Sequence, residues 1–131
     1  HWFRIQAQEE LAHAMLIHNY ILDRDASIDL RDIATSTASY DSLLDLFSKA
    51  LDHEREVTAD FNKIASLASE EKDFATINFT RYFVDEQVEE EASFRDIIDQ
   101  LKLVGENGHA IFMLGKELGV RIFVPPPQLA M

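Results

Sequence analysis

The sequence contains no cysteine, which excludes a disulfide scaffold and any metal site built on thiolates. A chain without cysteine suits a reducing compartment, and we expect a cytoplasmic protein. The longest uninterrupted apolar run, residues 110–114, is far shorter than the ~20 residues that span a membrane. Basic residues are also few: 12 Lys and Arg stand against 24 Asp and Glu, a formal net charge of −12. Because such a surface repels phosphate groups, we expect neither nucleic acid nor a membrane as a partner.

Glycine and proline are scarce as well, with four and three residues, so little interrupts regular structure. Apolar residues recur at steps of three or four, which is the period of an α-helix. We predict four helices, at about residues 1–23, 41–69, 74–104 and 109–118. Residues 24–40 lose the helical period, and Pro125–Pro127 bar a helix from the tail, residues 119–131. Asp41 or Ser39 is expected to cap the second helix.

The lengths of the connections predict the topology. Five polar residues, 69–73, suit an antiparallel hairpin between the second and third helices. The connection at 24–40 can span about 50 Å when extended, which exceeds the ~39 Å of a helix of about 26 residues. It can therefore cross a whole bundle. We expect an all-α fold: a single domain over residues 1–131, built as a helix bundle with one long crossover and a short C-terminal helix.

Three acidic residues lie on apolar helix stripes, where a hydrophobic side chain is expected. Glu10, Glu54 and Glu90 each fall between apolar neighbours on the same helix face. A buried carboxylate without a partner costs several kcal/mol, so three in one core indicate a shared cation. His13 follows Glu10 by three residues, which places both side chains on one face. Carboxylate and imidazole ligands together favour iron, manganese or zinc over calcium.

The three acidic residues also match in height along the predicted bundle. Glu54 and Glu90 each lie 18 residues from Lys72 at the centre of the hairpin, so they face each other. Glu10 lies 13 residues before Asp23, near the end of the first helix, and Glu54 lies 15 residues before Ser69, near the end of the second. These distances are comparable if the two helices are parallel. A lone Glu-x-x-His pair is common by chance. Three carboxylates that lie on apolar helix faces at the same height along the bundle predict a metal centre. Glu91 is expected to face solvent.

Four stretches of the sequence resemble the helices of a non-haem prokaryotic ferritin. HWFRIQAQEELAHAMLIHNYILDR is similar to the second helix, with the family's Glu-x-x-His at Glu10 and His13. LDHEREVTADFNKIASLASEEKDFATINF resembles the third helix and its turn, and FVDEQVEEEASFRDIIDQLKLVG resembles the fourth. GHAIFMLGKEL is similar to the short fifth helix. The resemblance therefore implies a ferritin-like bundle over nearly the whole chain.

The resemblance also implies roles for individual residues. Glu10 would bridge the two irons of a ferroxidase centre, and His13 would bind the first. Glu54 and Glu90 would hold the second iron, with Gln87 beside it. Three further acidic residues match an accessory third site that leads toward a storage cavity: Glu9, Glu86 and Glu89. Haem-binding relatives carry Met directly after the Glu that corresponds to Glu10, and this chain has Leu11 at that position. The resemblance therefore implies iron without haem.

The function implied by the resemblance is iron storage and detoxification. Dioxygen or peroxide would oxidise Fe(II) to Fe(III), and ferric mineral would collect inside a homo-oligomeric shell of 24 subunits. Family members begin with a further long helix, which supplies another Glu ligand and a nearby Tyr. The given sequence begins where the family's second helix begins, and we expect the first helix to lie outside these 131 residues.

Three alternatives to this interpretation differ in what they require. A ferritin-like bundle that lacks the first helix would act only as a structural or assembly subunit with an impaired centre. A di-iron peroxidase of the rubrerythrin kind would need a cysteine-ligated rubredoxin module. A DNA-protecting mini-ferritin would lack the short C-terminal helix and would place its metal site between subunits.

Overall fold

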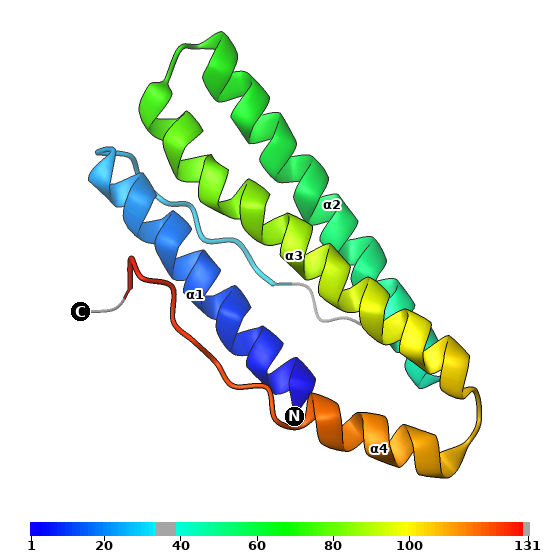
Figure 1. The fold of residues 1–131 in the computed structure, drawn as a ribbon. Coiled ribbons are helices and arrows are strands. Elements are labelled where there is room, and N and C mark those ends of the chain that lie inside the picture. The colour runs from blue at the N-terminus through cyan, green and yellow to red at the C-terminus, as the bar shows by residue number, and fades with distance from the viewer. Residues whose placement is uncertain (34–38, 130–131) are drawn as a thin grey trace. The chain divides into compact units, whose positions relative to one another are not determined.

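The computed structural model describes residues 1–33 and 39–129 and is helical wherever regular structure occurs in them. The four helices are α1 (Trp2–Asp23), α2 (Leu43–Glu70), α3 (Phe74–Val104) and α4 (Gly108–Leu118) (Figure 1). The predicted all-α class is confirmed, and the helices begin and end within two residues of the expected ranges. The expected crossover at 24–40 and tail at 119–131 each lie partly outside the described residues.

The chain divides into two compact units. One unit contains α1, α4 and the C-terminal tail, and the other contains α2 and α3. None of the helices in the described residues is long and apolar enough to cross a membrane.

The α2–α3 unit is a helical hairpin, and its two helices lie side by side (Figure 1). Ser42 caps α2, since its hydroxyl accepts a hydrogen bond of 3.0 Å from the backbone N–H of Asp45. The expected cap at Asp41 or Ser39 is wrong, because Ser42 occupies the cap position. Asp41 lies before it, and its backbone N–H donates to the Asp45 carboxylate at 3.1 Å. Asp73 caps α3, and Lys72 before it adopts a left-handed φ of 58° that reverses the chain.

Aromatic side chains fill the centre of this hairpin. Phe83 and Phe94 on α3 are each only 1% exposed. The ring of Phe61 on α2 stacks on Phe83 with 4.6 Å between centroids, and Phe47 approaches Phe94 at 6.1 Å. These contacts join the two helices over several turns. They therefore fix the positions of the polar residues that lie between the helices.

In the other unit, the chain beyond α4 returns to the beginning of α1 (Figure 1). Trp2, Ile5 and Leu16 on α1 are buried, as is Leu114 on α4. The Arg121 backbone carbonyl accepts a hydrogen bond of 2.8 Å from the His1 ring. The tail is therefore attached to the first turn of α1.

Candidate metal centre

The α1 part of the candidate centre consists of Glu10 and His13. The Glu10 Oε2 atom lies 3.8 Å from Nδ1 of His13, as the i, i+3 spacing predicts. The Gln6 amide donates a hydrogen bond of 3.1 Å to the other Glu10 oxygen, Oε1. The His13 side chain is 11% exposed, whereas that of Glu10 is 50% exposed. The expectation that Glu10 is buried is therefore wrong in the single chain. Its carboxylate nevertheless lies between two polar neighbours, Gln6 and His13.

The α2–α3 part of the candidate centre is buried, as the stripe pattern predicts. Glu54 is 6% exposed, Glu90 is 7% exposed and Gln87 is 4% exposed. The Gln87 amide donates to the Glu54 carboxylate at 3.2 Å and to the Glu54 backbone carbonyl at 3.1 Å. Because the amide binds both groups, Gln87 fixes the rotamer of Glu54 and stabilises its negative charge.

Three further polar residues, Thr58, Glu91 and Arg95, form a network beside Gln87 that the sequence did not predict. The Thr58 hydroxyl donates to the Glu91 carboxylate at 2.8 Å across the hairpin, and it lies 3.4 Å from the Gln87 amide nitrogen. Arg95 binds the other oxygen of Glu91 at 3.0 Å. The Glu91 side chain is only 20% exposed, so the expectation that it faces solvent is wrong. The Thr58 hydroxyl and the Arg95 guanidinium hold it against the hairpin instead.

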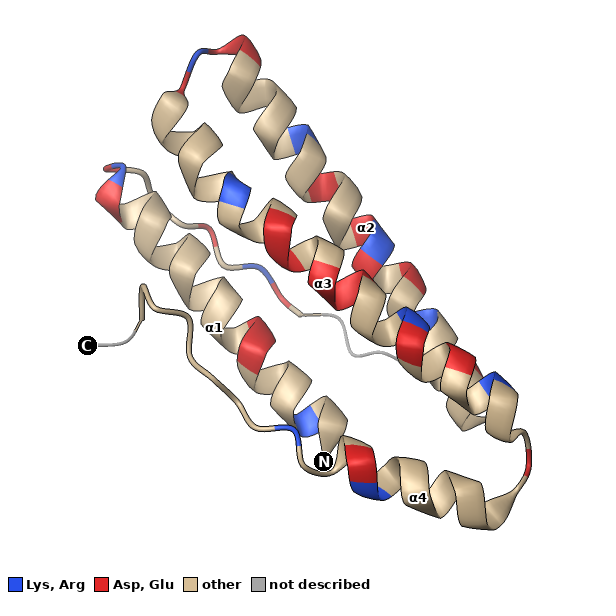
Figure 2. Cartoon of the chain, viewed as in Figure 1, with Lys and Arg blue, Asp and Glu red and all other residues tan. Residues whose placement is uncertain are grey.

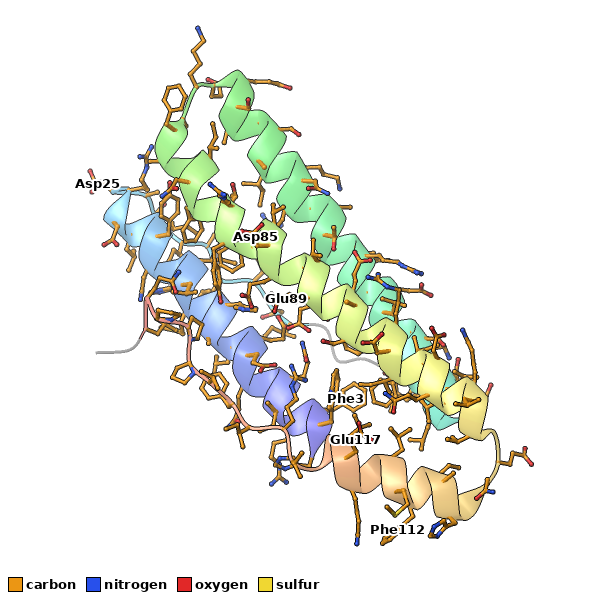
Figure 3. All side chains as sticks on the ribbon, viewed as in Figure 1. Phe3, Asp25, Asp85, Glu89, Phe112 and Glu117 are labelled. Atoms are coloured by element: carbon orange, nitrogen blue, oxygen red, sulfur yellow. The ribbon has the colours of Figure 1, made fainter. Side chains whose placement is uncertain are left out.

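The predicted accessory acidic residues lie in different environments. Glu89 is exposed and Glu86 is partly buried on α3, where Figure 3 shows Glu89 one turn beyond Asp85. Glu9 on α1 is partly buried and forms an ion pair with Arg121 of the tail. Burial raises the pKa of the Glu9 carboxyl above its ordinary value, while the Arg121 guanidinium opposes this rise. Glu9 is thus the accessory acidic residue with a cation already beside it.

Acidic residues are spread along α2 and α3, and basic residues lie among them (Figure 2). In the part of the chain that the structure describes, no three His, Asp or Glu side chains are close enough together to hold a metal ion. The candidate ligands come from both units: Glu10 and His13 from one, Glu54 and Glu90 from the other. The predicted convergence of three helices on one metal centre therefore stays a prediction. Chemically, the carboxylate and imidazole groups suit Fe(II), Mn(II) or Zn(II).

Comparison with known proteins identifies the relatives of this chain. A family model described as a ferritin-like domain matches residues 1–104. The bacterial non-heme ferritin of Staphylococcus aureus is 41% identical over 122 residues, which cover 93% of this chain and 74% of that protein. The bacterial non-heme ferritin of Staphylococcus haemolyticus is 37% identical and covers 90% of this chain and 71% of its own length.

Solved structures give the same result. A humanized archaeal ferritin superposes with a TM-score of 0.93 at 44% identity, covering 95% of this chain and 75% of its own. An open-pore ferritin of Archaeoglobus fulgidus superposes with a TM-score of 0.91 at 41% identity, covering 92% and 75%. The similarity therefore extends over both units.

Proposed function

Because the chain belongs to the ferritin family, we propose that it stores iron and oxidises Fe(II) to Fe(III) at a di-iron carboxylate centre. Iron is here the substrate and the cargo. Glu10 bridges two iron ions, His13 binds the first, and Glu54 and Glu90 bind the second. This proposal treats both units as one ferritin-like domain over residues 1–131.

The observation that carries the proposal is the burial of two carboxylates in one hairpin. Glu54 and Glu90 are 6% and 7% exposed, and the Gln87 amide holds Glu54 in place. Burying one carboxylate costs several kcal/mol in a folded protein, so an arrangement of two requires compensation. A divalent cation would supply that compensation, because it neutralises both charges and accepts their lone pairs.

The chemistry follows from the charge of the ligands. Two Fe(II) ions each lose one electron, and dioxygen takes up the two electrons and two protons to become hydrogen peroxide. Peroxide as the oxidant takes up two electrons and two protons and becomes water. Anionic carboxylates bind Fe(III) more strongly than Fe(II), so Glu54 and Glu90 favour the oxidised product. Gln87 keeps the Glu54 carboxylate in one orientation during the reaction.

Storage requires that the ferric product leaves the centre. We assign this path to the accessory acidic residues Glu9, Glu86 and Glu89, which attract cations toward a mineral cavity. The cavity would lie inside a homo-oligomeric shell of 24 subunits in the cytoplasm.

The competing proposal is a structural or assembly subunit with an impaired centre. The half-exposed side chain of Glu10 favours this alternative, since a bridging ligand is ordinarily enclosed. The two proposals differ in one measurable quantity, the rate of Fe(II) oxidation.

Aerobic Fe(II) oxidation, followed by the absorbance of the ferric product, tests the proposal. We expect Glu10→Ala and Glu54→Ala to slow the reaction by at least about 10- to 100-fold, because mutating even the residues that hydrogen-bond to metal ligands costs this much in metal affinity or activity. Glu56→Ala is the matched control, because the Glu56 side chain lies two residues from Glu54 and is 80% exposed. The assignment is wrong if both alanine variants oxidise iron at the wild-type rate. A wild-type chain that oxidises iron no faster than buffer would favour the structural alternative.

A further inference from the structure

Arg121 in the C-terminal tail makes an unusual number of contacts with α1. Its guanidinium lies 4.5 Å from the centroid of the Trp2 ring, donates to the Gln6 side-chain oxygen at 2.8 Å and pairs with Glu9. Its backbone carbonyl accepts a hydrogen bond from His1. The Arg121 and Glu9 side chains are only 24% and 20% exposed, so water screens their interaction less than at an open surface. All these residues belong to one unit.

Gln6 extends this contact toward the candidate centre. Its oxygen accepts from Arg121, and this orients its amide nitrogen to donate to Glu10 at 3.1 Å. An amide has one acceptor end and one donor end, so Arg121 determines which end faces Glu10. The guanidinium thus acts directly on Glu9 and, through Gln6, on Glu10.

We propose that Arg121 is the resident counter-cation of Glu9 and that a metal ion binds Glu9 only by displacing it. The proposal rests on the role given to Glu9 in the proposed function. A guanidinium and a divalent ion repel each other when both lie within a few ångströms of one carboxylate. Metal binding at Glu9 therefore moves Arg121 away from Glu9, Gln6 and Trp2, and it loosens the tail from α1. Arg121 in this way sets the cation affinity of Glu9.

Trp2 provides a direct readout, because it is the only tryptophan in the sequence. Zn(II) is a suitable probe, since it is redox-silent and takes the same carboxylate and imidazole ligands. We expect Zn(II) to shift the Trp2 emission of the wild-type chain as Arg121 leaves the ring. In Glu9→Gln, Zn(II) should leave the Trp2 emission unchanged.

Variants of Arg121 test the competition itself. We expect Arg121→Gln to show altered Trp2 emission without metal and to bind Zn(II) at Glu9 about tenfold more tightly, the effect of losing one charge-assisted hydrogen-bonded pair. Arg121→Lys keeps the charge and should restore most of the wild-type affinity, which a merely structural loss of the tail would not explain. Circular dichroism of each variant checks that its helices are intact.

Two outcomes would overturn the inference. One is Zn(II) binding that Glu9→Gln weakens but that leaves the Trp2 emission of the wild-type chain unchanged. The other is an Arg121→Gln chain with intact helices in which the Glu9-dependent Zn(II) affinity equals that of the wild type. If the wild-type chain oxidises Fe(II) and either outcome occurs, only the inference fails. If the chain does not oxidise Fe(II) but the Trp2 shift occurs and depends on Glu9, the proposed function fails. The displacement of Arg121 from Glu9 by metal is then still supported.

Discussion

Replacing Glu54 with glutamine should have opposite effects on stability without and with metal. Glutamine has nearly the same shape as glutamate but no charge. Its side-chain oxygen can still accept the hydrogen bond that the Gln87 amide donates at 3.2 Å. The substitution therefore removes a buried charge and leaves the packing of the hairpin intact.

The magnitude follows from the burial of this carboxylate. Glu54 is 6% exposed, and burying one charge costs several kcal/mol before compensation. A hydrogen bond to a charged group returns about 1.5–3 kcal/mol of that cost. We therefore expect Glu54→Gln to raise the free energy of unfolding of the metal-free chain by ~1–2 kcal/mol. For a chain of this size, the unfolding midpoint would rise by about 4 °C for each kcal/mol.

Metal should reverse the order of stability of the wild-type chain and Glu54→Gln. A ligand present at 100 times its dissociation constant stabilises a folded chain by about 2.7 kcal/mol. With Zn(II) in such excess, the wild-type chain should become more stable than Glu54→Gln, which has lost one anionic ligand.

Thermal unfolding followed by circular dichroism measures both effects, once with a chelator and once with Zn(II). Glu56→Gln is the control and should match the wild-type chain in both conditions, because its side chain is 80% exposed. The reasoning is refuted if Glu54→Gln is less stable than the wild-type chain without metal. Such a result would make the Glu54 carboxylate a structural group that needs no cation.

Three further predictions concern the hairpin. Phe83→Ala should lower the free energy of unfolding by about 3–5 kcal/mol, because the ring is 1% exposed and stacks across the hairpin. Phe74 is the control, since it is 76% exposed. In the same thermal assay, Phe74→Ala should change the free energy of unfolding by less than ~1 kcal/mol. Ser42→Ala should cost about 1 kcal/mol in chemical denaturation, because it removes the cap of α2. The hydrogen bond from Lys49 holds the pKa of Asp45 below its ordinary value of 3.8, so NMR titration should show this pKa rising in Lys49→Met. Because the folded pKa is the lower one, the stabilisation from this pair should be full above about pH 4 and vanish as the pH falls through the folded pKa.

The helices could be predicted from the sequence because apolar periodicity and turn residues are local signals. The bounds of α3 follow from Asp73 as its cap and Gly105 after its end, and both residues stand out in the sequence. The cap of α2 was predicted wrongly at Asp41 or Ser39, because Ser42 is a capping residue of the same kind and lies within three positions of both. Only the geometry of the backbone decides among them, and it selects Ser42.

The candidate site was predictable where it depends on one helix and not where it depends on partners. The stripe positions of Glu54 and Glu90 correctly predicted buried carboxylates, whereas the same reasoning was wrong for Glu10, whose side chain is 50% exposed. Helical period gives the direction of a side chain but not what lies opposite. Contacts between residues distant in the sequence were therefore missed, as with Glu91 on Thr58 and Arg121 on α1.

The most direct test of the proposed centre is the number of Fe(II) ions that stay bound to each chain after anaerobic gel filtration. We predict two ions for the wild-type chain, and fewer for Glu54→Gln and Glu10→Gln. Glu10→Gln should lose the most, because Glu10 is proposed to contact both ions. The proposed centre would be contradicted by a wild-type chain that retains no Fe(II), or by variants that retain as much as the wild type.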